Sequence, residues 1–185
     1  FSQVPVFQRP QVRIIVTGNE LLPPGSATTP FCIADANSPM LSALISRDGG
    51  HAIHSGILPD NPDSIRDALL DPAADIIIVS GGSSVGQEDY APSLLAALGS
   101  LDIHGIAMRP SSPTGMGLLD GRLVFLLPGN PVSCLCAYDF FAGRAIRQLS
   151  GLATKWPYPN EQLPLAQKLV SAIGRTDYAR VKIID

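Results

Sequence analysis

The sequence has few charged residues, no long apolar run and no set of paired cysteines. Only 16% of its 185 residues are charged, and the formal net charge is −3, which argues against an extended nucleic-acid-binding surface. No apolar run approaches the roughly 18 residues needed to cross a bilayer. Residues 1–11 also lack the charged start and apolar core of a signal peptide. Nothing in these properties points to nucleic acid or to a membrane.

The cysteines and histidines do not form recognisable catalytic or metal-binding patterns. Cys134 and Cys136 are separated by one residue, and Cys32 has no nearby partner. We therefore expect reduced, buried thiols in a cytoplasmic protein. The three histidines lie near the starts of predicted strands, and no Ser-His-Asp arrangement or zinc signature is evident. Nucleophilic hydrolysis and zinc catalysis are disfavoured accordingly.

What the sequence does contain is an alternation of short apolar runs and segments of helical period. The apolar runs are rich in β-branched residues, and we expect strands at 12–16, 52–57, 75–79, 103–108 and 123–127. This order predicts an α/β fold of three αβα layers around a mostly parallel sheet. Asp120-Gly121, between apolar flanks, predicts a hairpin and therefore an antiparallel element at one edge.

Proline-containing start signals mark most of the expected helices. Asn37-Ser38-Pro39 supplies a cap and a first-turn proline, and Gly49-Gly50 ends that helix. Asn61-Pro62 repeats the start signal. Two more helices are expected from about Tyr90 to Leu98 and, as one long helix, from Pro131 to Leu149.

The proline-rich stretch at 155–159 breaks this pattern and indicates a linker. Residues 167–184 have the pattern of strands. We therefore divide the chain into an N-terminal linker (1–11), an α/β domain (12–152), and a linker with the start of a small all-β domain (153–185). The chain begins with Phe1 and ends within a strand-like pattern, which suggests part of a longer protein.

The loop after the first strand and the loop after the third carry the first candidate site residues. Ligands bind outside the carboxyl ends of strands in doubly wound sheets. Thr17 to Leu22 combines a turn glycine, Gly18, with a carboxylate at the rim, Glu20. Ser80 to Tyr90 is rich in glycine and serine, so its amides and hydroxyls suit phosphate oxygens, and Asp89 could hold a divalent cation. A solvated loop acid and a plain flexible connector are the simpler alternatives.

Two further loops contain prolines next to polar residues. In Pro128 to Ser133, two prolines stiffen a loop in which Gly129 permits close approach to a ligand. Arg109 to Gly115 places a permanent cation beside prolines, which suits a bound anion, although a surface ion pair is the simpler role for Arg109. Asp35 with Asn37, and Asp60 with Asn61, are the remaining candidates, and both asparagines could simply be helix caps.

Taken in order, five segments resemble the MoeA/gephyrin-type molybdopterin molybdenumtransferase family. Each segment is weak alone, but the ordered set is specific, and the match runs from about Arg13 to Gly151. The tail from Gly174 to Val181 is similar to the first strands of the family's small C-terminal barrel. The five segments are Thr17–Leu21, Asp35–Ser38, Asp60–Pro62, Ser80–Tyr90 and Leu127–Ser133.

The resemblance implies insertion of molybdate into adenylylated molybdopterin with Mg²⁺-dependent release of AMP. It implies catalytic roles for Glu20, Asp60 and Asp89, with Glu20 and Asp89 holding Mg²⁺. It also implies a homodimer of the full-length protein, with neither nucleic acid nor membrane as a partner. The residues expected to bind the pterin nucleotide and molybdate are Thr17, Gly18, Asp35, Asn37, Ser38, Gly81, Gly82, Ser83, Ser84, Gly86, Arg109, Pro110, Pro113, Pro128, Gly129, Asn130, Pro131 and Ser133.

One loop departs from the family pattern. Where the family usually has Lys-Pro-Gly-x-Pro, this chain has Arg109-Pro110-Ser111-Ser112-Pro113, so a serine replaces the turn glycine. Three other functions remain open: a molybdopterin adenylyltransferase, a CinA-like nucleotide hydrolase, and a non-catalytic protein that binds a pterin or nucleotide.

Overall fold

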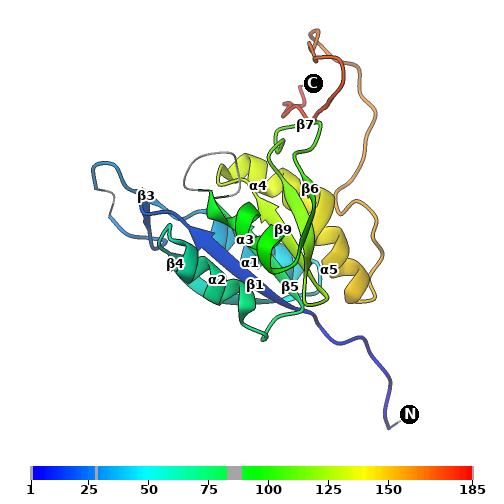
Figure 1. The fold of residues 1–185 in the computed structure, drawn as a ribbon. Coiled ribbons are helices and arrows are strands. Elements are labelled where there is room, and N and C mark those ends of the chain that lie inside the picture. Colours follow the sequence, from blue (N-terminus) through cyan, green and yellow to red (C-terminus); the bar gives the residue numbers. More distant parts are fainter. Residues whose placement is uncertain (1, 28, 83–88, 185) are drawn as a thin grey trace.

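The computed structural model describes residues 2–27, 29–82 and 89–184. Its central element is a six-stranded mixed sheet (Figure 1). The first four strands in the spatial order are parallel, and the last two run antiparallel to their neighbours. The order is β4 (His51–Leu58), β1 (Gln11–Thr17), β5 (Ile76–Ser80), β9 (Arg122–Leu127), β8 (Gly115–Leu119) and β6 (Ser100–His104).

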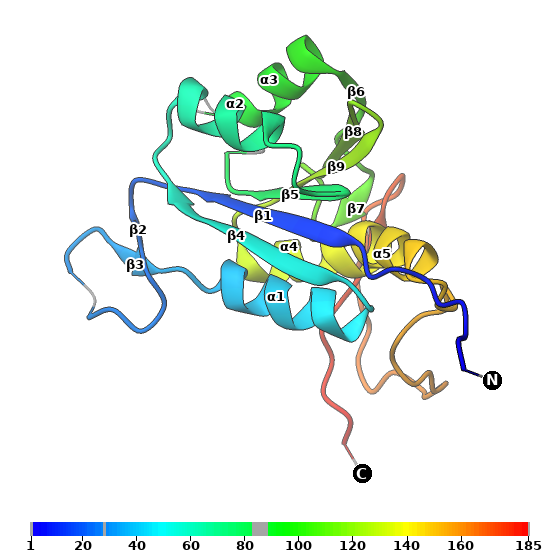
Figure 2. The ribbon, with the colours of Figure 1, turned by 90° about the horizontal axis from the view of Figure 1, so that it is seen from below.

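Helices cover both faces of this sheet, which confirms the predicted three-layer α/β fold. Figure 2 shows α2 (Pro62–Leu70) and α3 (Tyr90–Leu98) on one face. It shows α1 (Asn37–Arg47), α4 (Pro131–Ala137) and α5 (Gly143–Leu149) on the other face. Each layer of helices therefore needs its own apolar face of the sheet.

The strand sequences supply those two faces through their period of two. In β1, Ile14 and Val16 pack with α1 and the helix that includes α4, whereas Ile15 packs with α2 and α3. All four residues from Ile76 to Val79 are fully buried. A parallel strand buried on both faces has a continuous apolar sequence of this kind.

The hairpin between β8 and β9 also agrees with the sequence prediction. Asp120 and Gly121 have φ values of 50° and 77°, which is the conformation of a two-residue type I′ turn. Leu119 faces Arg122 across the turn. The hairpin reverses the chain and gives the sheet its antiparallel part.

The strand predicted at 103–108 is wrong in its bounds. The chain forms β6 from Ser100 to His104, turns at Gly105 with φ of 91°, and then forms a separate strand β7 (Met108–Arg109). The Gly105 amide donates to the Thr114 carbonyl at 3.0 Å. This turn leads the chain out of the main sheet, although the apolar pattern continues through it.

The helix predicted from Pro131 to Leu149 runs over that whole range but is not uniformly α-helical. A π-helical turn, η1 (Tyr138–Ala142), separates α4 from α5. The fully buried Tyr138 donates from its hydroxyl to Asp48 at 3.1 Å, and Asp139 accepts from Arg47 at 2.8 Å. The π-helical turn is thus accompanied by polar contacts with Arg47, at the end of α1, and with Asp48, the next residue. The spacing of apolar residues in the sequence does not predict such contacts.

The prediction of strands over 167–184 is also wrong for most of that range. In this part of the described chain, the structure has one short strand, β10 (Thr176–Asp177), which pairs in parallel with β7. A strand needs a neighbour for its backbone groups. Apart from β10 and the Tyr178 amide, which donates to the Arg109 carbonyl at 2.7 Å, the described residues of this range have no such pairing. The described helices include none that is long and apolar enough to cross a membrane.

Candidate functional site

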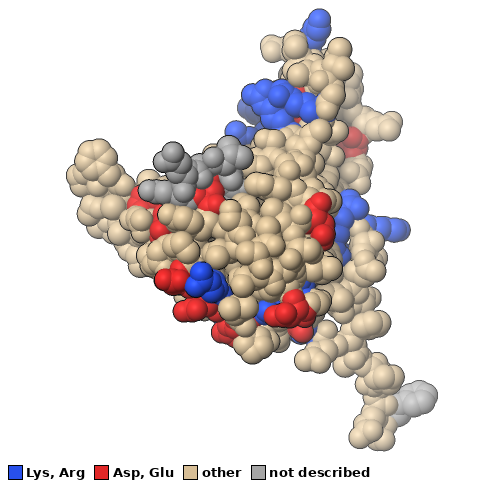
Figure 3. Space-filling model, in the orientation of Figure 1, with Lys and Arg blue, Asp and Glu red and all other residues tan. Residues whose placement is uncertain are grey.

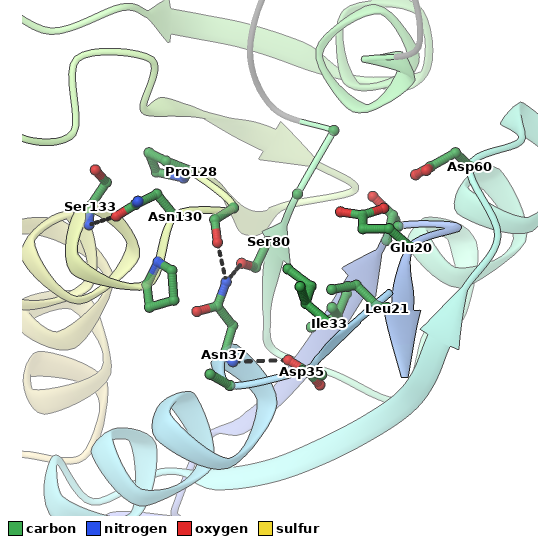
Figure 4. A pocket seen from close by; sticks show the side chains of 18 of the residues that line it. Glu20, Leu21, Ile33, Asp35, Asn37, Asp60, Ser80, Pro128, Asn130 and Ser133 are labelled. Atoms are coloured by element: carbon green, nitrogen blue, oxygen red, sulfur yellow. Dashed lines mark hydrogen bonds between the residues drawn. The ribbon is translucent and has the colours of Figure 1, made fainter. Parts of the chain in front are cut away.

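A cavity of about 720 Å³ lies at the carboxyl ends of β1, β5 and β9 (Figure 4). Loops that are far apart in sequence meet there, as expected at this edge of a parallel sheet. Most of the residues predicted for the site line the cavity. They are Thr17, Gly18, Glu20, Asp35, Asn37, Asp60, Gly81, Gly82, Asp89, Pro113, Pro128, Gly129, Asn130, Pro131 and Ser133.

The remaining predicted residues do not form its wall or cannot be placed. Ser38 lines a neighbouring cavity, and its backbone amide donates to Asp35 at 3.0 Å. Arg109 is exposed in β7, and Pro110 follows it outside the cavity wall. The predictions for Ser83, Ser84 and Gly86 fall outside the described residues.

The cavity also contains residues that the sequence analysis did not name individually as site residues. Ser80, the last residue of β5, is almost fully buried and accepts a hydrogen bond from the Asn37 side chain at 2.8 Å. Its place at the carboxyl end of a buried strand was an available signal. Leu21 and Ile33, on the paired short strands β2 (Leu21–Leu22) and β3 (Ile33–Ala34), add an apolar wall. Leu21 belongs to the candidate loop from Thr17 to Leu22, whereas no sequence signal marked Ile33.

Asn37 joins helix α1 to the rest of the site instead of capping the helix, so the capping hypothesis for Asn37 or Ser38 is wrong. The N-cap position is Ala36, and the Asp35 carboxylate accepts from the Asn37 amide at 2.8 Å. Asn37 Nδ2 donates to Ser80 Oγ and to the Gly129 carbonyl oxygen, both at 2.8 Å. The asparagine is thus free to hold the loops after β5 and β9 against α1.

Glycine is required where the loops after β1 and β5 meet. Gly81 has φ of 94°, and a Cβ atom there would lie 2.5 Å from the Thr17 carbonyl oxygen. A Cβ atom on Gly129 would lie 3.5 Å from the Cα atom of Gly81. The floor of the cavity is therefore built from backbones that lie close together, and at Gly81 this geometry excludes a side chain.

The start of α4 faces the cavity with a capped first turn. The Asn130 side chain accepts from the amides of Val132 and Ser133 at 3.1 and 3.3 Å. Pro131 occupies the first helical position and has no amide to offer. The positive end of the helix dipole would attract a bound anion here. The amides of Val132 and Ser133, however, already donate to Asn130.

Carboxylates gather at another part of the cavity wall. Glu20 and Asp60 lie near each other in Figure 4. Asp60 is fixed by a reciprocal pair of bonds, in which the Asn19 amide donates to Asp60 Oδ2 at 3.0 Å and the Asp60 amide donates to Asn19 Oδ1 at 3.2 Å. Asp89 lines the same cavity from the start of α3.

This donor set suits a cation that is shared with a ligand. Within the described residues, no group of three His, Cys, Asp or Glu side chains is placed to hold a metal ion by itself. Mg²⁺ commonly uses one or two carboxylates together with phosphate oxygens and water. The carboxylates present therefore fit Mg²⁺ bound together with a phosphate-containing ligand.

The loop that departs from the family pattern is tied to α4. Ser111 has φ of 88°, which places a serine in the left-handed region that favours glycine. Its hydroxyl donates to the Ser133 carbonyl at 2.6 Å, and the Thr114 hydroxyl donates to the Ser111 carbonyl at 2.7 Å. These bonds hold the loop in the turn and bring Pro113 to the cavity wall.

Cys134 lies behind the cavity and is not a nucleophile. Its Sγ atom is 3.7 Å from Ser80 Oγ, and the residue is fully buried. Burial raises the pKa of the thiol to about 12. Since the thiolate is the reactive form, the sulfur is inert near neutral pH.

Acidic and basic side chains are unevenly distributed over the face of the molecule shown in Figure 3. Figure 3 shows acidic side chains over the part that carries α2 and β4, and basic side chains toward the C-terminal segment beside β7. No broad basic surface is visible on this face. The distribution agrees with the small net charge of −3.

Comparison with known proteins gives one family for most of the chain. Residues 13–148 match the model of a family described as a probable molybdopterin binding domain. A molybdopterin molybdenumtransferase from Nostoc sp. is 38% identical over 160 residues, covering 83% of this chain and 37% of the relative. Molybdopterin molybdenumtransferase 2 from Mycobacterium tuberculosis is 34% identical over 192 residues, covering 97% of this chain and 46% of the relative.

A solved structure gives the same result for the fold. The molybdopterin biosynthesis MoeA protein from Pyrococcus horikosii aligns with a TM-score of 0.70 and 34% identity. The alignment covers 77% of this chain and 36% of that protein. The chain thus spans less than half the length of the relatives it matches.

Proposed function

Because this chain belongs to the molybdopterin-binding domain family, we propose that it serves molybdenum cofactor biosynthesis as a molybdopterin molybdenumtransferase. In this reaction molybdate is inserted into adenylylated molybdopterin, and AMP is released with the help of Mg²⁺. The observation that carries the proposal is the meeting of glycine-lined loops and carboxylates in one cavity. Glycine loops allow close approach of phosphates, and carboxylates suit a cation bound to them.

The pterin nucleotide would lie along the Gly81-Gly82 and Gly129-Asn130 loops. Three polar atoms of cavity-lining residues have no hydrogen-bond partner among the described residues: Thr17 Oγ1, Asp35 Oδ2 and Asn37 Oδ1. Buried polar atoms are normally paired. A ring system rich in N–H groups, as a pterin is, would suit these acceptors.

The carboxylates would act on the pyrophosphate part of the ligand. Glu20 and Asp89 would hold Mg²⁺, which when bound neutralises charge on the linkage to be cleaved. Asp60 would be a further catalytic carboxylate, kept in place by Asn19. Asn130 and Pro131 would hold the start of α4, and with it Ser133, against the same ligand.

We place the oxyanion near the loop from Arg109 to Thr114. Pro113 would border the molybdate, because it lines the cavity. Arg109 is exposed outside the wall, so it and Pro110 would act at the entrance, where the guanidinium attracts anions over several ångströms. Ser38 and the residues Ser83, Ser84 and Gly86 complete the proposed binding set.

The proposal extends to the organisation of the protein. Residues 12–152 would be the pterin-binding domain, preceded by a linker and followed by the linker and first strands of a β domain at 153–185. The full-length protein would act as a homodimer. Its unpaired cysteines favour the cytoplasm as the place of the reaction.

The experiment is an assay of AMP release from adenylylated molybdopterin by the full-length protein, with and without molybdate. We expect release to require both molybdate and Mg²⁺, and to fall by at least about 100-fold in Glu20→Gln and Asp89→Asn. Asp63→Asn is the matched control, because Asp63 is an exposed carboxylate on α2 outside the cavity. Release that is indifferent to the first two changes would refute the assigned roles.

A non-catalytic pterin-binding protein is the second candidate, favoured by the position of Arg109 outside the cavity wall. It predicts binding of adenylylated molybdopterin without molybdate-dependent AMP release. The same assay, run beside a binding titration, separates the two functions.

A further inference from the structure

The segment from Trp156 to Tyr178, called the strap below, contacts the α/β domain at its two ends. The ring of Phe140, in η1, lies 4.8 Å from the ring of Trp156 and 4.2 Å from the ring of Tyr178, measured between centroids. Both ends of the strap thus converge on one side chain. In between, Leu169, Val170 and Ile173 are exposed.

Hydrogen bonds reinforce the first end of the strap. The Tyr158 hydroxyl donates to Asp139 Oδ2 at 2.8 Å, and Arg47 Nη1 donates to the Tyr158 hydroxyl at 2.8 Å. The ring of Tyr158 packs edge-on against Trp156, with centroids 5.5 Å apart. These contacts join the strap to η1 and to the end of α1.

The second end of the strap forms a two-stranded ladder with β7. The Thr176 amide donates to the Ala107 carbonyl at 2.9 Å, and the Tyr178 amide donates to the Arg109 carbonyl at 2.7 Å. β10 and β7 run side by side in Figure 1, at the end of the molecule where the C-terminal segment lies. The ladder gives β7 the backbone partner that it lacks in the main sheet.

β7 leads directly into the turn at the cavity. The residue that follows Arg109 in the chain starts the turn in which Ser111 is bonded to Ser133 and Pro113 lines the cavity. α4 holds this turn through Ser133, and the amides of Gly105 and Ile106 donate to the carbonyls of Thr114 and Ser112 at 3.0 and 2.8 Å. The strap holds β7, which leads into the turn. Loss of the strap contact would remove the support of β7, the strand that enters the turn at Arg109.

We propose that Tyr178 is a positioning residue for the turn from Pro110 to Thr114, acting through the β7–β10 ladder. Its ring, packed against the Phe140 ring at an interplanar angle of 49°, fixes β10, and its amide, which donates to the Arg109 carbonyl, fixes Arg109. The proposal rests on the proposed function only in naming molybdate as the ligand whose binding the turn controls. The structural part, that Tyr178 orders the turn, does not depend on it.

The first experiment measures amide hydrogen exchange without ligand in wild type, Tyr178→Ala, Tyr178→Phe and the exposed control Ile173→Ala. We expect Tyr178→Ala to speed exchange at residues 106–114 by about tenfold, with β1 and β5 unchanged, because a packed aromatic pair contributes about that factor. Tyr178→Phe keeps the ring and should behave as wild type. Thr176→Pro, which removes the amide that donates to Ala107, should have the same local effect as Tyr178→Ala.

The second experiment measures molybdate-dependent AMP release by the same variants of the full-length protein. Positioning predicts that Tyr178→Ala raises the KM for molybdate about tenfold while kcat changes less than about twofold, since misplacement of a binding loop weakens uniform binding. The proposal would be overturned if residues 106–114 exchanged at the wild-type rate in both Tyr178→Ala and Thr176→Pro. It would also be overturned if exchange became faster over the whole chain. If the wild type releases no AMP, the proposed function fails, and the exchange data alone decide the role of Tyr178.

Discussion

The side-chain amide of Asn37 donates a hydrogen bond to the carbonyl oxygen of Gly129 at 2.8 Å. The same nitrogen donates to Ser80 Oγ, so one side chain joins the start of α1 to the loops after two parallel strands. The Gly129 carbonyl can only accept, which fixes the orientation of the amide and turns Asn37 Oδ1 away from these partners. Asn37 therefore joins three parts of the cavity wall: the start of α1, the end of β5 and the loop after β9.

Replacement of Asn37 by alanine should therefore affect both stability and ligand binding. The change leaves Ser80 Oγ and the Gly129 carbonyl without their donor, which should destabilise the fold by about 1–3 kcal/mol in urea unfolding. The control is Asn61→Ala, because Asn61 caps α2 by accepting from the Ser64 amide and its loss should cost about 1 kcal/mol. The affinity for adenylylated molybdopterin should fall in Asn37→Ala and stay unchanged in Asn61→Ala. Equal affinities of the two variants would contradict this role for Asn37.

Gly81→Ala should be among the most damaging single-methyl changes in the site. The new Cβ atom would lie 2.5 Å from the Thr17 carbonyl oxygen, at a φ of 94°. We expect a loss of about 3 kcal/mol in unfolding free energy. Gly25→Ala is matched for positive φ, but its Cβ atom would meet nothing within 4 Å, so it should cost about 1 kcal/mol. Similar losses in the two variants would show that close backbone contact is not the cause.

Ser111 combines an unfavourable backbone angle with a favourable hydrogen bond. Ser111→Ala keeps φ near 88° and removes the donor to Ser133, so thermal or urea unfolding should show a loss of about 1 kcal/mol. Ser111→Gly loses the same bond but relieves strain worth about 1 kcal/mol, so its stability should stay near wild type. Glycine less stable than alanine at this position would disprove the account of the turn.

Cys134 should resist alkylation in the folded protein. Burial raises its pKa from an ordinary value of 9.0 to about 12, so iodoacetamide at pH 8.5 should modify it far more slowly in the folded than in the urea-unfolded state. Because the folded-state pKa lies above the unfolded one, the stability contributed by the neutral thiol is complete below about pH 9 and is lost as the pH rises toward 12. A pH titration of unfolding in Cys134→Ala should lack this part of the decline.

The sequence predicts the framework of the fold well, because its signals are local and repeated. Buried parallel strands such as 76–79 are continuous apolar runs, and Asp120-Gly121 is a turn signal that needs no distant contact. The predictions that are wrong involve chain segments whose partners lie far away. The π-helical turn accompanies contacts with Asp48 and Arg47, and strand formation near the end of the chain depends on pairing with β7.

The same distinction applies to the candidate site. Loops that follow strands could be located from the strands themselves, so Gly81, Gly129 and Asp60 were expected at the edge where the cavity lies. The bond from Asn37 to Gly129 joins residues 92 positions apart, and no spacing in the sequence encodes it. The exposed position of Arg109 in β7, a strand that pairs with the distant β10, could not be predicted from the sequence either.

The most direct test of the central claim is a calorimetric titration of the full-length protein with adenylylated molybdopterin in the presence of Mg²⁺. We expect one ligand per chain in the wild type. Affinity should be at least about tenfold lower in Gly129→Val, whose side chain would enter the cavity, and unchanged in the control Gly25→Ala, which lies outside it. Absence of binding to the wild type, or equal affinity in Gly129→Val, would contradict the assignment of this cavity to the pterin nucleotide.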